Sequence, residues 1–216
     1  MPSTGRSTGT SHLVRRLIRI ERRCAGGFVG VREARSRSGI LASMPTLVMD
    51  PAPAEIDALI EYRRSLDLDH YDEVWDGVLH MNPPPAAEHQ YILQQLAELF
   101  GPLARRAGFV ALLNEFGLGD GKDNYRVPDG GIHRAVPRGV YQTTAALVIE
   151  VVSPADKSWE KFDFYAAHDV DEVLIIDRSK QEVHWFGLRD GEYQLIERSG
   201  LIDLGPSELA EQIDWP

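Results

Sequence analysis

Several features that would assign a function directly are missing from this sequence of 216 residues. It has one cysteine, Cys24, which excludes a disulfide framework and a cysteine-ligated zinc site. No apolar run reaches the ~18 residues that a membrane-spanning helix needs. The glycine-rich segment 117–121 is not followed by Lys-Ser or Lys-Thr, so nucleotide binding has no support. The histidines form no i, i+4 pair of the kind that binds zinc, and no internal repeat is present.

Basic residues are scarce outside the first part of the chain. Residues 1–43 contain nine arginines and two acids, a charge of +7, whereas the whole chain carries −10. Residues 44–216 therefore carry −17, which argues against a generic nucleic-acid binder because such proteins present a basic face.

The first 43 residues are rich in Ser, Gly and Arg. This composition predicts a disordered tail, or sequence upstream of a later start at Met44. It is also typical of a transit peptide and of a nucleic-acid-binding arm, and both alternatives stay open. Residues 44–216 are predicted to form one folded domain.

The hydrophobic pattern of this domain predicts helices mixed with strands. The helices are expected over 54–66, 86–107 and 156–167. The strands are expected over 71–75, 78–81, 109–113, 125–127, 131–133, 145–152, 172–176, 183–188 and 192–197. This order predicts an α/β (α+β) fold with a central mixed sheet flanked by helices and an N-terminal hairpin.

Turn and cap signals define the limits of some of these elements. Asp76-Gly77 is a strong hairpin signal because both turn positions need a positive φ. In the long helix, Pro102 is expected to kink or divide the helix, and Gly108 is expected to cap its end.

Three acids stand where the surrounding pattern does not favour a charge. Glu150 interrupts the apolar run 147–152, where a lone carboxylate is costly unless it pairs with a cation. Asp129 follows Pro128, and Glu73 lies in the first strand of the hairpin. Each has a structural alternative: Glu150 could pair with a core cation, Asp129 could be a turn residue, and Glu73 could face solvent.

Two lysines follow these acids on the helix predicted over 156–167. Lys157 and Lys161 are four residues apart and share a helix face, so both could point at the same carboxylates. Trp159 and Tyr165 are expected to pack this helix on the sheet.

Carboxylates that converge near the end of a sheet are the ligands that Mg²⁺ or Mn²⁺ prefers. Such an ion polarises a phosphodiester, and a nearby lysine can orient the attacking water or neutralise the charge that develops. The combination predicts metal-assisted phosphodiester hydrolysis.

The ordered set of motifs resembles the Uma-two family of bacterial restriction endonucleases, which is similar to the PD-(D/E)xK nucleases. The resemblance covers roughly residues 45–200 and includes a hairpin, a histidine at the start of the long helix, and an acid–acid–lysine series. The matching positions are Glu73, Gly77, His89, Pro128-Asp129, 150–154, Lys161, Tyr165 and Asp177. The wider nuclease pattern has a lysine two residues after the glutamate, where this chain has Val152. The family position for the lysine matches Lys161, with Lys157 as the reserve.

The resemblance implies a metal-dependent, restriction-type endonuclease with a restriction-endonuclease-like core. Glu73, Asp129, Glu150 and Lys161 would be the catalytic residues. Asp129, Glu150 and Glu73 would hold Mg²⁺ or Mn²⁺. The displaced lysine and the acidic domain leave an alternative open, a catalytically inactive nuclease fold that serves as a binding or interaction module.

Duplex DNA is the expected partner, and a two-fold homodimer would match its symmetry. A cytoplasmic protein without membrane contact is expected. DNA contact would need a basic rim. The candidates are Arg105, Arg106, Lys122, Arg126, Arg134 and Arg138.

Overall fold

The computed structural model describes residues 47–49, 57–152 and 157–216. The chain divides into two compact units, Met1–Ile40 and Leu41–Pro216, and every described residue belongs to the second. The tail predicted over residues 1–43, the start proposed at Met44 and the first residues of the helix predicted over 54–66 lie outside the described residues. The assignment of residues 1–43 therefore stays a prediction.

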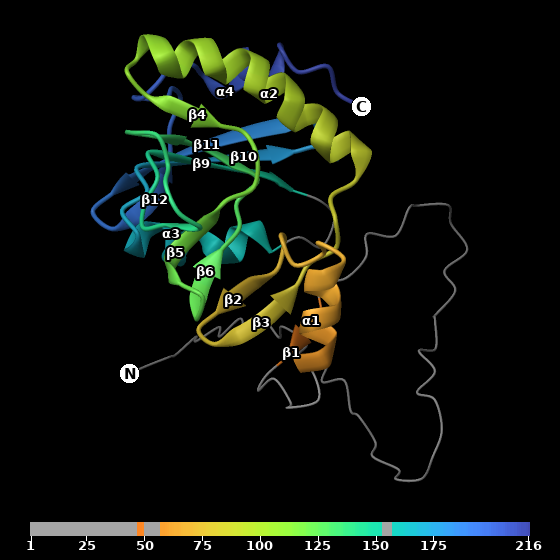
Figure 1. The fold of residues 1–216 in the computed structure, drawn as a ribbon. Helices are drawn as coiled ribbons and strands as arrows, with labels where there is room; N and C mark the ends of the chain where they lie inside the picture. Colours follow the sequence, from red (N-terminus) through yellow and green to blue (C-terminus); the bar gives the residue numbers. More distant parts are fainter. Residues whose placement is uncertain (1–46, 50–56, 153–156) are drawn as a thin grey trace, which may run out of the picture. The chain divides into compact units, whose positions relative to one another are not determined.

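Helices and strands alternate along the described part of the chain (Figure 1). The helices are α1 Asp57–Ser65, α2 Ala87–Arg106, the 3-10 helix η2 Ser158–Lys161, α3 Phe162–Ala167 and α4 Pro206–Ala210. The first six strands are β1 Leu47–Met49, β2 Glu73–Trp75, β3 Val78–Met81, β4 Val110–Leu112, β5 Gly117–Gly121 and β6 Asn124–Arg126. The others are β7 Gly130–His133, β8 Tyr141–Gln142, β9 Leu147–Val152, β10 Glu172–Asp177, β11 Glu182–Arg189 and β12 Glu192–Leu195.

These strands form two six-stranded sheets, both of mixed direction. The hairpin sheet has the order β1-β3-β2-β6-β5-β8, and the central sheet has the order β12-β11-β10-β9-β7-β4. In the central sheet β9 and β10 are parallel, while β7 and β11 run antiparallel to their neighbours. The predicted α/β class with helices around mixed strands is confirmed, and the extended segments divide between two sheets.

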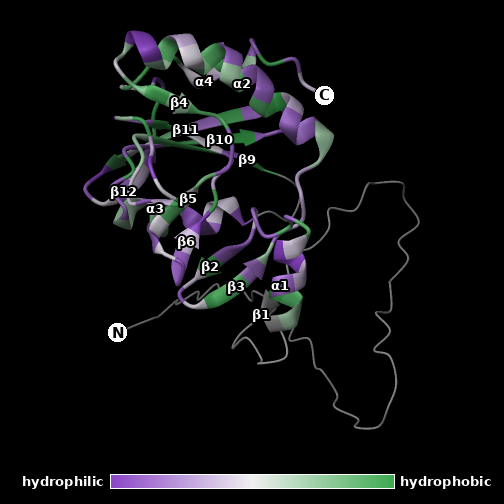
Figure 2. Cartoon of the chain, viewed as in Figure 1, coloured by the Kyte–Doolittle hydropathy of each residue, from purple (hydrophilic) through white to green (hydrophobic). Residues whose placement is uncertain are grey.

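The central sheet is covered on both faces. Figure 1 shows α2 and α4 on one face, and α3 with strands β5 and β6 toward the other. One apolar cluster joins α2 and α4 to Leu147, Ile149 and Val151 of β9. The other joins Val148 and Val152 of the same strand to α3. The apolar residues of β9 and β10 therefore form the centre of the molecule (Figure 2).

The predicted hairpin turn and helix cap are confirmed, whereas the predicted division of the long helix at Pro102 is not. Asp76 and Gly77 have φ of 50° and 83°, as the hairpin between β2 and β3 requires, and Gly108 has φ of 82° just after α2. Helix α2 continues undivided through Pro102. Pro102 is exposed, while Phe100 and Ala104 beside it are fully buried against the central sheet. This packing outweighs the one backbone hydrogen bond that proline removes. Among the described residues, no helix is long and apolar enough to cross a membrane.

Candidate active site

Glu150 lies in the middle of β9 and points to the face of the central sheet that carries α3. Side chains alternate along a strand, so Glu150 shares its face with Val148 and Val152. It is only 3% exposed. Such a carboxylate needs partners, since an unpaired buried charge is costly. The partners come from the helical segment that follows.

The helical segment from η2 into α3 presents one polar face to Glu150. The Ser158 hydroxyl donates to Glu150 Oε2 at 3.1 Å, and the Lys161 ammonium donates to Glu150 Oε1 at 3.0 Å. The Tyr165 hydroxyl also donates to Oε1. These residues are three and four positions apart, which is the spacing that places side chains on one helix face. Local helix periodicity thus gathers three donors on one carboxylate.

Lys161 links two carboxylates that come from different sheets. Its Nζ lies 2.9 Å from Glu73 Oε1 on β2 and 3.0 Å from Glu150 Oε1 on β9. The lysine is 7% exposed and Glu73 is 2% exposed, so these ion pairs are shielded from water. Lys157 instead places its Nζ 5.7 Å from the centre of the Trp75 ring. The geometry therefore favours Lys161 over Lys157 as the lysine of the site.

Glu73 has further fixed donors around it. The backbone N–H of Val127 donates to Oε1 at 2.8 Å, and the Trp75 indole N–H donates to Oε2 at 2.7 Å. Trp75 is itself held by stacking on His80, with ring centres 4.5 Å apart. The Glu73 carboxylate is therefore rigidly oriented toward Lys161.

Asp129 stands immediately before β7, beside Glu150. Its backbone N–H donates to the Ile149 carbonyl at 3.1 Å, and its Oδ2 accepts from the Val151 N–H at 2.7 Å. The neighbours of Glu150 in sequence thus hold the Asp129 backbone and side chain in place. Oδ1 lies 3.1 Å from Nε2 of His89, which opens α2. Asp129 retains 18% side-chain exposure, so it forms the accessible side of the cluster.

The pKa of His89 reflects this neighbour. Burial alone would lower the pKa of His89, but the charge of Asp129 and the contact with its carboxylate outweigh burial and raise the pKa. The contact is an ion pair rather than a well-aligned hydrogen bond, because Nε2 is buried without a partner of good hydrogen-bond geometry.

Tyr165 is held in its neutral form. Burial, with the charges of Glu150 and Glu73 behind it, raises the pKa of the phenol well above its usual value. The hydroxyl therefore keeps its proton and remains a hydrogen-bond donor to Glu150.

The four residues that the sequence singled out lie together. Glu73 and Glu150 both contact Lys161, and Asp129 is bonded to the residue that follows Glu150. Sequence reasoning did not place Ser158 or Trp75 in the site, and it gave Tyr165 as a family-motif position without a role there, although all three hold its carboxylates. The spacing of Ser158 and Lys161 was the available signal for Ser158. Their roles in catalysis stay predictions.

The carboxylate oxygens of the cluster suit a hard divalent cation, but the number of carboxylates that could bind it is small. Mg²⁺ is commonly held by one or two carboxylates that leave several positions to water and phosphate. Asp129 and Glu150 on adjoining strands meet that need, and each Asp129 oxygen has one contact where a carboxylate oxygen can accept two. Within the described residues, however, no group of three His, Cys, Asp or Glu is arranged to hold a metal ion. The contacts of Glu73 favour a role in holding Lys161, and its role as a third ligand stays a prediction.

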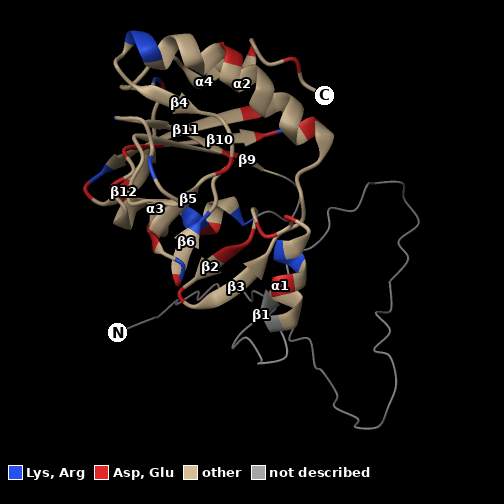
Figure 3. Ribbon diagram, in the orientation of Figure 1, with Lys and Arg blue, Asp and Glu red and all other residues tan. Residues whose placement is uncertain are grey.

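The basic rim expected for DNA contact is only partly available. Arg126 is 5% exposed, and its guanidinium lies between the rings of Trp75 and Phe164, at 4.4 and 4.0 Å from their centres. It supports Trp75 rather than reaching solvent, so its predicted contact with DNA is wrong. Arg134 is exposed but paired with Asp171. Figure 3 shows the remaining basic residues scattered among acidic ones.

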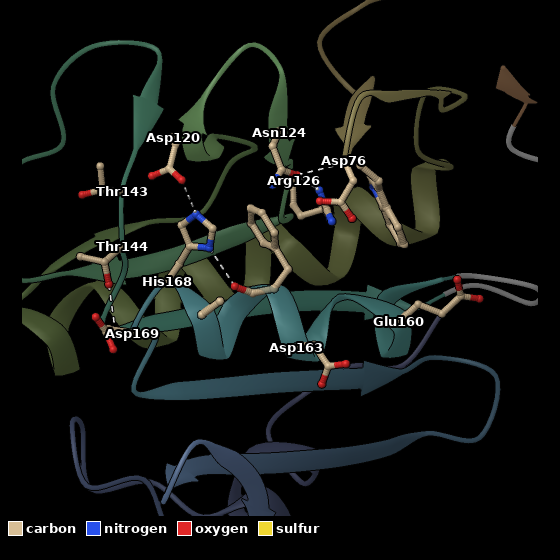
Figure 4. Close-up of a pocket in the computed structure, with 13 residues that line it drawn as sticks. Asp76, Asp120, Asn124, Arg126, Thr143, Thr144, Glu160, Asp163, His168 and Asp169 are labelled. Carbon is tan, nitrogen blue, oxygen red and sulfur yellow. Dashed lines mark hydrogen bonds and ion pairs between the residues drawn. The ribbon is translucent and has the colours of Figure 1, made fainter. Parts of the chain in front are cut away.

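A pocket of about 760 Å³ is lined by Trp75 and by residues of α3, among others (Figure 4). Its lining contains five exposed acids. They are Asp76, Asp120, Glu160, Asp163 and Asp169. Concentrated negative charge repels a phosphate backbone. These acids therefore do not favour phosphate contact in this pocket, although Arg126 and His168 also line it.

Comparison with known proteins identifies a shared fold and a family. A protein from Anabaena variabilis, described as "a putative nuclease belonging to DUF820", matches the structure with a TM-score of 0.53 at 16% identity. The match covers 65% of this chain and 90% of that one, and it shows a shared fold. The fold class is thus that of a nuclease-like α/β core.

The family model for Uma2, described as "Putative restriction endonuclease", matches residues 60–213. The chain belongs to the Uma2 family. No curated protein matches the chain. Family and fold are those of a restriction-type nuclease.

Proposed function

We propose that this protein is a divalent-metal-dependent endonuclease that hydrolyses DNA phosphodiester bonds. The observation that carries the proposal is the buried lysine shared between two carboxylates, with Asp129 bonded beside it. A structural ion pair needs one carboxylate, whereas here a second buried carboxylate contacts the same lysine. Buried clusters of charged side chains with no evident structural need are candidates for functional sites.

Each residue of the cluster has a distinct role in the proposed reaction. Asp129 and Glu150 would hold Mg²⁺ or Mn²⁺, which when bound supplies Lewis acidity toward the phosphodiester. Lys161 would place its positive charge where negative charge develops on the phosphate. Glu73 holds the ammonium in position, and Tyr165 keeps its proton and orients Glu150.

The test is nicking of supercoiled plasmid DNA with Mg²⁺ or Mn²⁺ by the full chain. Glu150→Gln preserves size and removes charge, and we expect it to lower the nicking rate at least ~100-fold. Glu172→Gln is the matched control, because Glu172 is an equally buried glutamate on the neighbouring strand β10, facing the opposite side of the sheet. Equal nicking by wild type and Glu150→Gln would contradict the proposal, since it would point to a contaminating nuclease.

A second candidate function is a non-catalytic binding module built on the same fold. The observation that favours it is the ammonium of Lys161, which already contacts both Glu73 and Glu150. Calorimetric titration with Mn²⁺ separates the two functions. An enzyme should bind the ion and lose it on Asp129→Asn, whereas a wild type that binds no ion and nicks no DNA supports the module. The two-fold dimer stays a prediction in either case.

A further inference from the structure

The turn that carries Lys161 has three faces with three different surroundings. A 3-10 helix has three residues per turn, so positions three apart align. Ser158 and Lys161 face the buried carboxylate of Glu150. Glu160 and Asp163 align on the face that lines the acidic pocket (Figure 4). The third face carries Trp159 and Phe162, and the proposed reaction uses neither of them.

Trp159 is half in solvent although it has rings to pack against. Its ring centre lies 5.6 Å from Phe162, 5.8 Å from Phe186 and 6.0 Å from His184. It is nevertheless 46% exposed, while Trp185 on β11 is fully buried. The expectation that Trp159 packs the helix on the sheet is therefore only half met. The neighbouring rings pack against the indole of Trp159, and part of its aromatic surface remains exposed to solvent.

Strand register places this aromatic surface close to the carboxylate cluster. Ile175 of β10 pairs with Glu150 on one side and with His184 of β11 on the other. The three residues thus form one row across the sheet, and alternation puts all three side chains on the α3 face. Two strand spacings separate His184 from Glu150, a distance of ~10 Å. That distance equals about three nucleotide steps along a duplex strand.

Side-chain chemistry distinguishes this face from its neighbour. The pocket is lined by exposed acids, whereas the face with Trp159 presents aromatic surface beside His184, which is paired with Glu182. Aromatic side chains that bind nucleic acids stack on the faces of bases, which a continuous duplex hides. The exposed indole therefore suits a base that is out of the helix.

We propose that Trp159 is a stacking platform for an unpaired nucleobase within a few nucleotides of the bond to be cleaved. The inference rests on the proposed function and extends it to a substrate class. The preferred substrate is DNA that contains single-stranded bases, such as an overhang, a flap or an open junction, over uniform duplex. Trp159 binds the base, and the Asp129–Glu150–Lys161 cluster binds the phosphate.

Binding without turnover tests the inference apart from the nuclease activity. The probe is a fluorescently labelled single-stranded oligodeoxynucleotide, compared with the blunt duplex of the same sequence, in metal-free buffer at low salt. Anisotropy should show that Trp159→Ala raises the Kd for the single strand ~5- to 100-fold and changes that for the duplex less than twofold. Trp159→Phe should retain most of the affinity because it keeps an aromatic face.

Two control variants and a parallel nicking assay distinguish base stacking from general apolar contact and from loss of catalysis. Leu195→Ala removes another exposed apolar side chain, on strand β12, and should leave both Kd values unchanged. Glu172→Gln, a substitution outside the candidate site, should also leave both Kd values unchanged. Nicking by the wild type is measured in parallel, so a failure of the catalytic proposal is recognised separately.

Three results would overturn the inference. In the first, Trp159→Ala weakens single-strand and duplex binding equally. In the second, the wild type binds neither oligonucleotide. In the third, sedimentation shows a wild-type dimer that Trp159→Ala dissociates while the Kd for the single strand stays the same, which would assign this face to a second copy of the chain.

Discussion

Two glutamates on neighbouring strands of the central sheet show how the same residue serves different ends. Glu150 on β9 is 3% exposed and Glu172 on β10 is 6% exposed. Glu172 accepts from the Trp185 indole at 2.8 Å, the Ser199 hydroxyl at 2.7 Å and the Gly200 backbone at 2.7 Å. All its donors are neutral. Glu150 instead contacts a lysine that a second carboxylate also contacts.

This difference teaches how to separate a structural from a functional buried acid. Neutral donors hold Glu172 as a clamp between β10, β11 and the loop after β12, and burial still raises the pKa of Glu172 despite those hydrogen bonds. In the Glu150 region two carboxylates from different sheets contact one lysine, an arrangement that a clamp of the Glu172 kind does not need. Substitutions in the two regions should therefore differ in their effects.

The largest effect is expected when the shared cation is removed. Lys161→Met leaves the Glu73 and Glu150 carboxylates buried without their lysine, and we expect the free energy of unfolding to fall by ~3–5 kcal/mol. Urea denaturation measures the change. Lys180→Met is the matched control, because Lys180 pairs with Asp177 at 2.8 Å but is 63% exposed, and its loss should leave the free energy of unfolding nearly unchanged. Similar losses in both variants would show that the buried cluster contributes no more than a surface pair.

A smaller loss is expected in the Glu172 region. Glu172→Gln places an amide NH₂ against either the Trp185 N–H or the Gly200 N–H, and neither donor can become an acceptor. The free energy of unfolding should fall by ~1–3 kcal/mol, measured by the same denaturation. An unchanged stability would mean that the clamp tolerates a lost hydrogen bond. Plasmid nicking by this variant should equal that of wild type.

The pH dependence of stability, compared between wild type and Glu172→Gln, gives a second test of the Glu172 region. Because burial raises the pKa of Glu172 above its ordinary value of 4.5, the folded state binds the proton more tightly than the unfolded state. The stability from this group is fully present below pH 4.5 and is lost as pH rises through the raised pKa. The stability of wild type relative to Glu172→Gln should therefore fall between pH 4 and pH 7, measured by urea denaturation at each pH. A relative stability that grows with pH would contradict the assignment.

The smallest stability effect is expected at the candidate site itself. In Glu150→Gln the amide oxygen can still accept from Lys161 and Tyr165, and the amide NH₂ can donate to the Ser158 hydroxyl, which can reverse its role. Because the variant can keep these hydrogen bonds, the free energy of unfolding should change by less than ~1 kcal/mol. Thermal denaturation checks this value. A loss as large as that of Glu172→Gln would make Glu150 a structural acid like its neighbour.

Much of the fold could be predicted from local pattern. The apolar run that Glu150 interrupts predicted a strand over 145–152, and all six residues of β9 are buried. Asp76-Gly77 predicted the β2–β3 hairpin through its need for positive φ. The prediction that Pro102 divides the helix was wrong, because the loss of one backbone hydrogen bond costs less free energy than the burial of α2 supplies. That burial depends on tertiary packing, which a local sequence rule does not measure. The division into two sheets depends on strand pairings between residues far apart in the chain.

The candidate site divides in the same way. Glu150 could be identified because it is an acid in an apolar strand. The order of the motifs identified Glu73, Asp129 and Lys161. The sequence could not show that Arg126 is stacked between two rings, since its partners Trp75 and Phe164 are 51 and 38 positions away. Nor could it show that His89 lies beside Asp129, which the docking of α2 on the central sheet decides.

Although it missed β1, β5, β8 and α4, the order of residues alone predicted most of the helices and strands, the family, and the acids and lysine that stand apart from the pattern. These follow from short-range periodicity and from turn stereochemistry, both of which lie within a few residues of each position. Only the tertiary structure decided which lysine joins Glu73 to Glu150, which arginine is withdrawn from solvent and which tryptophan remains exposed. Those outcomes depend on how two sheets and a short helix pack, and packing energies are set by neighbours in space and not in sequence.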